Sequence, residues 1–245
     1  MVVNVCLSTA LHIAIQADNR PLFVLLLAQA ALDVNLKTVD EHVPLYYALL
    51  KYESGDDSEE SYACQLLVKG AHTGALYSSN CDSLLQKVVE DGATNAAVFL
   101  CDHLTNVNHV NGDGETALHA ACAKNSPQVV DKLLELGVNP NLLTNELRQS
   151  PLHYAVKSNS VECVEVFIKR GEGANFNARD INGETPISLA LNEGHKDLVP
   201  VLIRGNADVN VRNGKDFTLL HQAILKEDAK TALFLLDNGA DINAK

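Results

Sequence analysis

The chain has 245 residues, of which 47% are hydrophobic, 5% are aromatic and none is tryptophan. With 19 Lys and Arg against 31 Asp and Glu, the formal net charge is -12. This charge argues against nucleic acid or an anionic membrane surface as the main partner, because both need a basic footprint. No apolar run is long enough to predict membrane insertion. The six cysteines include no Cys-x-x-Cys pair, which predicts buried thiols in a reducing, cytoplasmic compartment.

A four-residue motif recurs along the chain. Clear copies are Thr-Ala-Leu-His from Thr9 and Thr116, Ser-Pro-Leu-His from Ser150 and Thr-Leu-Leu-His from Thr218. Weaker copies start at positions 43, 83 and 185. A period of about 33 residues predicts stacked repeats, each packing on its neighbours. We number the repeats one to seven from the starting residues 9, 43, 83, 116, 150, 185 and 218.

Repeat four illustrates the local pattern. Thr116 is a good helix cap, and Pro127 predicts the start of a second helix. Gly137 predicts the end of that helix in a left-handed conformation. The predicted buried stripe of the second helix is Val129, Val130, Leu133, Leu134 and Leu136. In other repeats the residues expected at the stop position are Gly70, Gly171, Asn206 and Gly239.

Repeats two and three depart from this pattern. The interval between positions 43 and 83 is the longest in the chain, and residues 52–60 form an insertion with five acidic residues. Val43 is a weak cap, and Gln86 replaces the motif histidine in repeat three. We therefore predict that residues 43–104 are the least stable part of the array.

Together these features resemble the ankyrin-repeat family. The resemblance is carried by Ser-Pro-Leu-His-Tyr-Ala from Ser150, by Gly-Ala-Asp-Ile-Asn from Gly239 and by the period. It implies an all-α solenoid of about seven helix-turn-helix repeats with β-hairpin-like connecting loops, forming a single array over residues 1–245. It also implies that the motif histidines bond at the helix caps. The implied function is a protein–protein interaction scaffold that binds a protein or peptide on its concave face.

A narrower resemblance is to the rabankyrin family of endosomal proteins, which combine ankyrin repeats with a lipid-binding FYVE zinc domain. It is carried by Thr-Ala-Leu-His-Ile-Ala-Ile-Gln from Thr9 and Leu-Asp-Val-Asn-Leu-Lys-Thr from Leu32. It implies a Rab-type GTPase as partner and association with endosomes through domains outside this chain. Because the last helix carries no polar replacements, we expect a fragment of a longer protein. Two alternatives remain: a substrate-recruiting or autoinhibitory segment of a larger enzyme, or a passive spacer.

The sequence predicts no catalytic, cofactor or metal site. It contains no nucleophile elbow, P-loop or dinucleotide fingerprint. Cys101, His103 and His109 come nearest to metal-ligand spacing, but a structural zinc site normally has four ligands. We therefore expect a protein that is not an enzyme.

The predicted partner site lies at the fingertips and at the exposed ends of first helices in repeats four to seven. Apolar residues occur there with arginine between them, a composition typical of binding hot spots. The predicted contact residues are Lys124, Leu147, Arg148, Lys157, Arg179, Ile181, Arg212, Lys215, Phe217 and Leu225. This composition favours an acidic peptide segment with apolar anchors.

Overall fold

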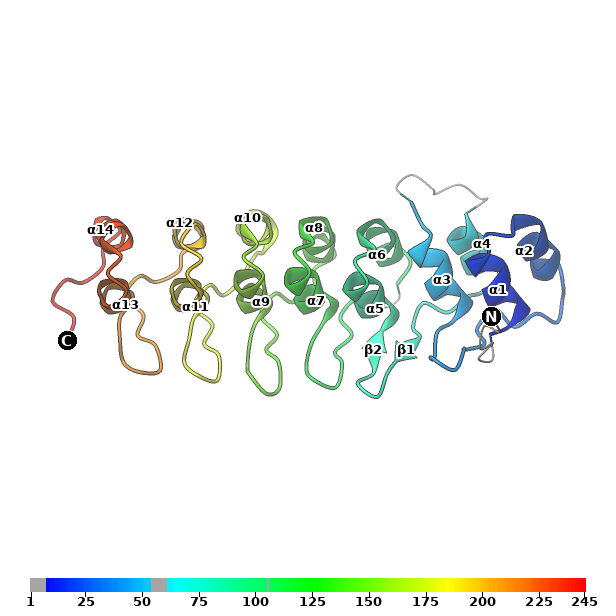
Figure 1. The fold of residues 1–245 in the computed structure, drawn as a ribbon, viewed down its shortest axis with the longest axis horizontal. Coiled ribbons are helices and arrows are strands. Elements are labelled where there is room, and N and C mark those ends of the chain that lie inside the picture. The colour runs from blue at the N-terminus through cyan, green and yellow to red at the C-terminus, as the bar shows by residue number, and fades with distance from the viewer. Residues whose placement is uncertain (1–7, 54–60, 105) are drawn as a thin grey trace, which may run out of the picture. The chain divides into compact units, whose positions relative to one another are not determined.

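The computed structural model describes residues 8–53, 61–104 and 106–245. The chain divides into two compact units, residues 1–112 and residues 113–245. Both units consist of pairs of short helices, as the all-α solenoid prediction requires (Figure 1). The prediction of one continuous array over residues 1–245 stays a prediction, and most of the acidic insertion, residues 54–60, lies outside the described residues.

The described residues of the first unit form three helix pairs and, in the finger of repeat three, a two-stranded antiparallel hairpin. Its elements are α1 (Ala10–Gln16), α2 (Arg20–Leu27), α3 (Pro44–Leu50), α4 (Tyr62–Val68), β1 (Leu76–Tyr77), β2 (Asp82–Ser83), α5 (Leu84–Glu90) and α6 (Thr94–Cys101). In the hairpin, Leu76 pairs with Ser83 and Tyr77 pairs with Asp82.

The second unit contains four helix pairs. Its elements are α7 (Ala117–Ala123), α8 (Pro127–Glu135), α9 (Pro151–Lys157), α10 (Val161–Arg170), α11 (Pro186–Glu193), α12 (Leu198–Arg204), α13 (Leu219–Leu225) and α14 (Ala229–Asp237). Within this unit, Figure 1 shows α7, α9, α11 and α13 in one row and α8, α10, α12 and α14 in a second row. We call these the inner and outer helices, and we call the extended segment before each inner helix its finger.

The inner helices begin where the recurring motif predicts. Their N-caps in the second unit are Thr116, Ser150, Thr185 and Thr218. At Thr218 the side-chain oxygen accepts a hydrogen bond from the backbone N–H of His221, which satisfies one of the free N–H groups of the first turn. Val43 caps α3 without any side-chain acceptor, so repeat two lacks this contribution.

The outer helices bury the predicted stripe with one exception. Val129, Val130 and Leu133 are fully buried, and Leu134 is nearly so. The prediction for Leu136 is wrong, because α8 ends at Glu135 and Leu136 is its C-cap, with 40% of its surface exposed. Leu118 of the inner helix has no exposed surface and lies in the core between repeats.

Left-handed residues end the helices at four of the five predicted positions. These are Gly70, Gly137, Asn206 and Gly239, with φ of 94°, 75°, 65° and 88°. The prediction for Gly171 is wrong, since its φ is -79°. The longer α10 extends to Arg170, and the Gly171 N–H still donates to Phe167 O in the helical pattern. The left-handed residue there is Gly173, two residues later.

Gly205 is required by close packing rather than by its φ. A Cβ atom at this position would lie 2.2 Å from the ring of Phe176, which is itself buried. The loop after α10 therefore places its aromatic side chain directly against the end of α12. Within the described ranges, no helix combines the length and the apolar character that crossing a bilayer requires.

Candidate partner-binding face

The motif histidines hold the fingers in place. His119 Nδ1 accepts the Thr116 N–H at 3.1 Å, so the ring proton lies on Nε2, which donates to Gln149 O at 3.2 Å, at the base of the next finger. His153 makes the same contacts with Ser150 and, at 3.1 Å, with Glu184 O. Burial lowers the pKa of His119 to about 4, so the ring is neutral at pH 7. The predicted capping role of these histidines is confirmed.

Repeat six has Ser188 in place of the histidine, and another contact takes over. The shorter side chain bonds within its own repeat, to Glu184 Oε2 and Thr185 O. Instead, Arg179 Nη1 of finger six donates to Gly183 O at 2.9 Å and to Arg212 O of finger seven at 2.6 Å. Thus an arginine predicted to contact a partner also joins two fingers.

Neighbouring fingers also touch through their backbones. The Ile181 N–H donates to Leu147 O at 2.9 Å, and the Asn145 N–H donates to Asp113 O at 2.8 Å. Gly214 lies so close to finger six that a Cβ there would be 2.0 Å from Asn182 O. These contacts keep the exposed side chains of successive fingers at defined separations.

An asparagine after each of several outer helices links consecutive repeats. Asn141 donates to Gly173 O at 2.8 Å and accepts the Asn175 N–H at 2.7 Å. Asn35, Asn177 and Asn210 make the same pair of bonds. Gly74 lies four residues after Gly70, as Asn141 lies four after Gly137, so glycine replaces the linking asparagine after α4. The neighbouring Thr73 hydroxyl donates to His103 O at 3.4 Å.

The four apolar side chains singled out from the sequence are exposed. The exposed fraction is 44% for Leu147, 57% for Ile181, 40% for Phe217 and 68% for Leu225. Three lie on fingers, and Leu225 is the last residue of α13. The edge-to-face contact of Phe217 with the His221 ring, at 6.0 Å between centroids, holds this aromatic side chain at the finger base. We call the fingers 144–149, 179–184 and 211–217, with the C-terminal ends of α7, α9, α11 and α13, the finger face.

The basic residues of the finger face differ in their freedom. Arg212 Nη1 bonds Asp216 O at 2.9 Å and lies 3.4 Å from the Asp216 carboxylate. Lys157 donates to Gln149 Oε1 at 2.7 Å. By contrast, three basic side chains of the finger face, those of Lys124, Arg148 and Lys215, are exposed and make no hydrogen bond or ion pair with the described residues.

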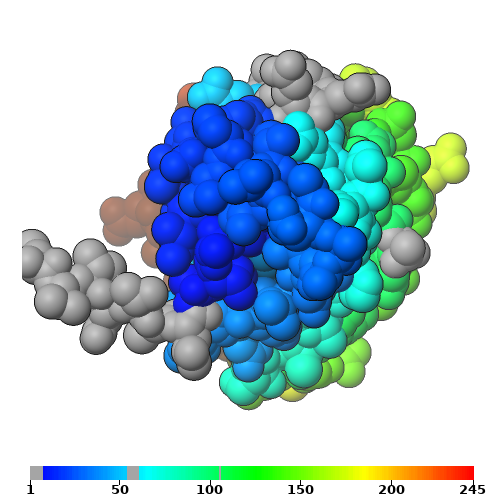
Figure 2. Space-filling view, turned by 90° about the vertical axis from the view of Figure 1, so that its right-hand side faces the viewer, coloured from blue at the N-terminus to red at the C-terminus, as the bar shows by residue number. Residues whose placement is uncertain are grey.

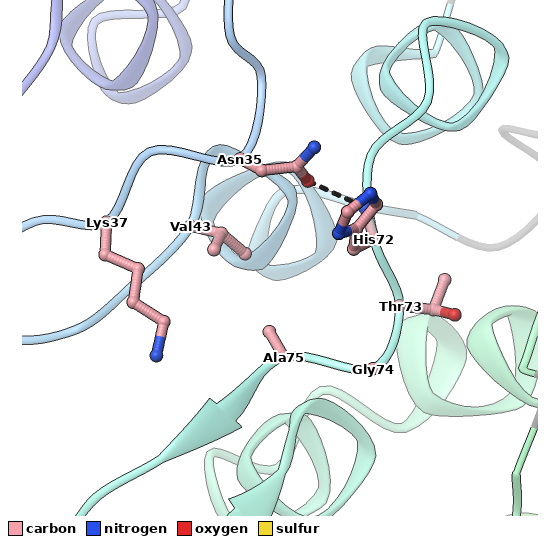
Figure 3. Close-up of a pocket in the computed structure, with 7 residues that line it drawn as sticks. All are labelled: Asn35, Lys37, Val43, His72, Thr73, Gly74 and Ala75. Carbon is pink, nitrogen blue, oxygen red and sulfur yellow. Dashed lines mark hydrogen bonds between the residues drawn. The ribbon is translucent and has the colours of Figure 1, made fainter.

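Two features of the first unit were not anticipated. A hollow of about 430 Å³ lies between the loops that follow α2 and α4, lined by Asn35, Lys37, Val43, His72, Thr73, Gly74 and Ala75 (Figure 3). Its polar groups bond internally: the Asn35 Oδ1 accepts the His72 N–H at 2.8 Å, and Lys37 donates to Leu76 O at 2.8 Å. The hollow therefore does not assemble a set of free catalytic groups.

The second feature is an apolar surface at the end formed by α1 and α2, which faces the viewer in Figure 2. Leu22, Val24 and Leu25 of α2 are 37%, 49% and 61% exposed. The apolar run of α2 was visible in the sequence, but its exposure depends on which helices pack beside it.

The residues nearest to metal-ligand spacing are directed apart. Cys101 is buried, His103 Nδ1 lies 2.9 Å from Phe99 O, and His109 Nε2 lies 2.7 Å from Cys81 O. Across the residues that the structure describes, no three His, Cys, Asp or Glu side chains gather where they could hold a metal ion.

Comparison with known proteins identifies the family to which this architecture belongs. A family profile described as ankyrin repeats (3 copies) matches residues 57–144, 85–180, 127–213 and 152–245. The chain belongs to the ankyrin-repeat family. Ankyrin repeats are a protein–protein interaction fold.

Several curated proteins share these ankyrin repeats. Rabankyrin-5 of Homo sapiens is 31% identical over 269 residues, which is 91% of this chain and 23% of that protein. The E3 ubiquitin-protein ligase KEG of Arabidopsis thaliana is 31% identical over 53% of the chain, and this match covers 8% of that protein. The B-cell lymphoma 3 protein homolog of Mus musculus is 34% identical over 55% of the chain. The chain thus spans about a quarter of the length of Rabankyrin-5.

Proposed function

We propose that this chain is a non-enzymatic scaffold that binds a protein or peptide partner through the finger face. The observation that carries the proposal is the set of four exposed apolar side chains on braced fingers and on the end of α13. Exposed apolar residues are individually ordinary, but a recurring set held at fixed separations resembles an interface core. A passive spacer would not need them.

The charges of the face favour a particular partner chemistry. Arg148 directly follows Leu147 in the chain, and Lys215 precedes Phe217 by two residues. Neither basic side chain has a partner among the described residues. A segment with acidic side chains next to apolar ones would satisfy both groups. Because the whole chain carries a net charge of -12, this attraction is local and should weaken as salt rises.

Arg179 and Arg212 have a supporting part in this proposal. Their guanidinium groups bond finger carbonyls, so they position the face, while Lys124, Leu147, Arg148, Lys157, Ile181, Lys215, Phe217 and Leu225 supply contacts. Removing Phe217 and Arg148 together should therefore test contact without disturbing the fingers.

The test uses binding of fluorescent acidic peptides that carry leucine or phenylalanine at every second position. The double variant F217A/R148A should weaken binding by at least about 2 kcal/mol, roughly 30-fold. Ile181→Asp should act in the same direction. Ile168→Asp is the matched control, because Ile168 is 38% exposed on the outer helix α10. Equal losses from both aspartate variants would place the site elsewhere.

The similarity to Rabankyrin-5 over 91% of the chain supports a second, finer proposal. We infer that the chain acts in endosomal trafficking, with a Rab-type GTPase as partner and with its membrane association supplied by other domains. Surface plasmon resonance against purified endosomal Rab proteins, each loaded with GDP or a GTP analogue, tests this. Binding that depends on the nucleotide and on Ile181 supports the proposal, and nucleotide-independent binding contradicts it.

A further inference from the structure

The buried side-chain amide of Gln222 makes no hydrogen bond to the described residues. Gln222 lies on α13 and is 5% exposed, and among the residues that the structure describes neither its Oε1 nor its Nε2 has a hydrogen-bond partner. Leaving a buried donor and acceptor unpaired destabilises the fold, because each group loses the hydrogen bonds that water would supply. An unpaired buried amide of this kind therefore requires an explanation.

Packing alone does not require glutamine at this position. The equivalent residue is Leu189 in repeat six, which is 8% exposed, and Ala120 in repeat four. In repeat five it is Tyr154, whose hydroxyl donates to Glu115 Oε1 at 2.5 Å. The other repeats of the second unit thus use an apolar side chain here or a satisfied polar one.

Gln222 also lies next to the finger face. It is three residues before Leu225, the last residue of α13, and four before the C-cap Lys226, so the three share one side of the helix. Leu225 is 68% exposed, and the Lys226 ammonium extends to Leu191 O and Asn192 O at the end of α11. The amide is therefore just beneath the surface that the proposed function assigns to the partner.

We propose that Gln222 is a main-chain anchor for an extended partner segment. On binding, its flexible side chain turns outward, Nε2 donates to the carbonyl of one partner residue, and Oε1 accepts the N–H of the same residue. In an extended strand these two groups point to the same side, as they do in a hydrogen-bonded antiparallel pair. A carboxylate would satisfy only Nε2, so the amide selects main chain rather than an acidic side chain.

This inference rests on the proposed function and assigns different roles to different residues of that site. Pairing with main chain gives affinity that does not depend on the partner's sequence. The apolar residues Phe217 and Leu225 and the free Lys215 then select the partner's side chains. The unpaired amide destabilises the folded protein without its partner, and the bound segment removes this effect by pairing with the amide.

The experiment compares Gln222→Leu with wild type, using the peptide acetyl-Glu-Leu-Asp-Phe-Glu-Leu-amide and versions of it methylated at one backbone nitrogen each. Gln222→Leu should raise the urea midpoint, because it removes an unpaired buried group, and should weaken peptide binding about tenfold. One N-methylated peptide should bind wild type and variant equally. Gln128→Leu, an exposed position on the outer helix α8, is the matched control and should leave binding unchanged.

The outcomes separate this inference from the proposed function. If Phe217→Ala weakens peptide binding and Gln222→Leu does not, the finger face is the site and the anchor is wrong. A lowered urea midpoint for Gln222→Leu would also overturn it, because the amide would then be satisfied within the fold. If wild type does not bind the peptide, or if Phe217→Ala has no effect on binding, the proposed function itself is wrong.

Discussion

Replacing Arg179 with alanine should loosen finger seven, although the side chain is exposed and far from the core. The substitution removes the bonds from Nη1 to Gly183 O at 2.9 Å and to Arg212 O at 2.6 Å. Arg179 provides the link to the next finger in repeat six, because Ser188 bonds within its own repeat and does not reach the next finger as His119 and His153 do.

The size of the effect follows from the exposure of these groups. A hydrogen bond with a charged donor contributes about 1.5–3 kcal/mol when it is buried. Here water can replace the guanidinium at both carbonyls, so we expect about 1–2 kcal/mol in total. That energy corresponds to a change of roughly 5- to 30-fold in the local opening equilibrium.

Amide hydrogen exchange measures this opening directly. The N–H groups of Asn213 and Asp216, which bond Phe217 O and Asn213 O within finger seven, should exchange faster by that factor in Arg179→Ala. Arg148→Ala is the control, because the Arg148 side chain is exposed and has no partner among the described residues. If the two variants exchange alike at Asn213 and Asp216, Arg179 does not brace the finger.

Three further predictions concern the core, the caps and the weak repeats. Leu118→Ala should lower the free energy of unfolding in urea by about 2–5 kcal/mol. Gly137→Val should lower it more than Gly137→Ala, because φ is +75° at this position and, with no neighbouring atom crowding the site, backbone strain decides the difference. Equal, small losses for all three variants would contradict the predicted register of the repeats. The pKa of His119 is lowered to about 4 in the folded chain, so the unfolded chain binds more protons as pH falls, and the free energy of unfolding decreases by up to about 3 kcal/mol from pH 7 to pH 4. His119→Gln should make the free energy of unfolding depend less on pH over this range. An unchanged pH dependence in this variant would mean that other groups cause it. Residues 43–104 should exchange faster than residues 116–236, and Gly74→Asn should slow that exchange more than Gly74→Ala by supplying the asparagine side chain that links other repeats. The reverse order of exchange rates would refute this prediction.

The sequence by itself determined the elements and their order. A cap such as Thr116 acts within three residues of itself, and Gly137 acts through its own backbone, so both signals are readable along the chain. The burial of Leu118 followed as well, because helical spacing places it on the apolar face. The two errors have different causes. Leu136 is the C-cap of α8, which ends at the same point of its repeat as α12 and α14, whereas Gly171 follows α10, which is one residue longer.

Only the tertiary structure decided the roles of the side chains on the finger face. Arg179 and Lys215 are both basic fingertip residues in sequence, yet one bonds a carbonyl 33 residues away and the other is free among the described residues. In the sequence Gln222 does not differ from any other helical glutamine, but in the structure its amide is buried without a hydrogen-bond partner among the described residues. These differences depend on the distance between stacked repeats, and that distance results from packing along the whole unit rather than from any local stretch of residues.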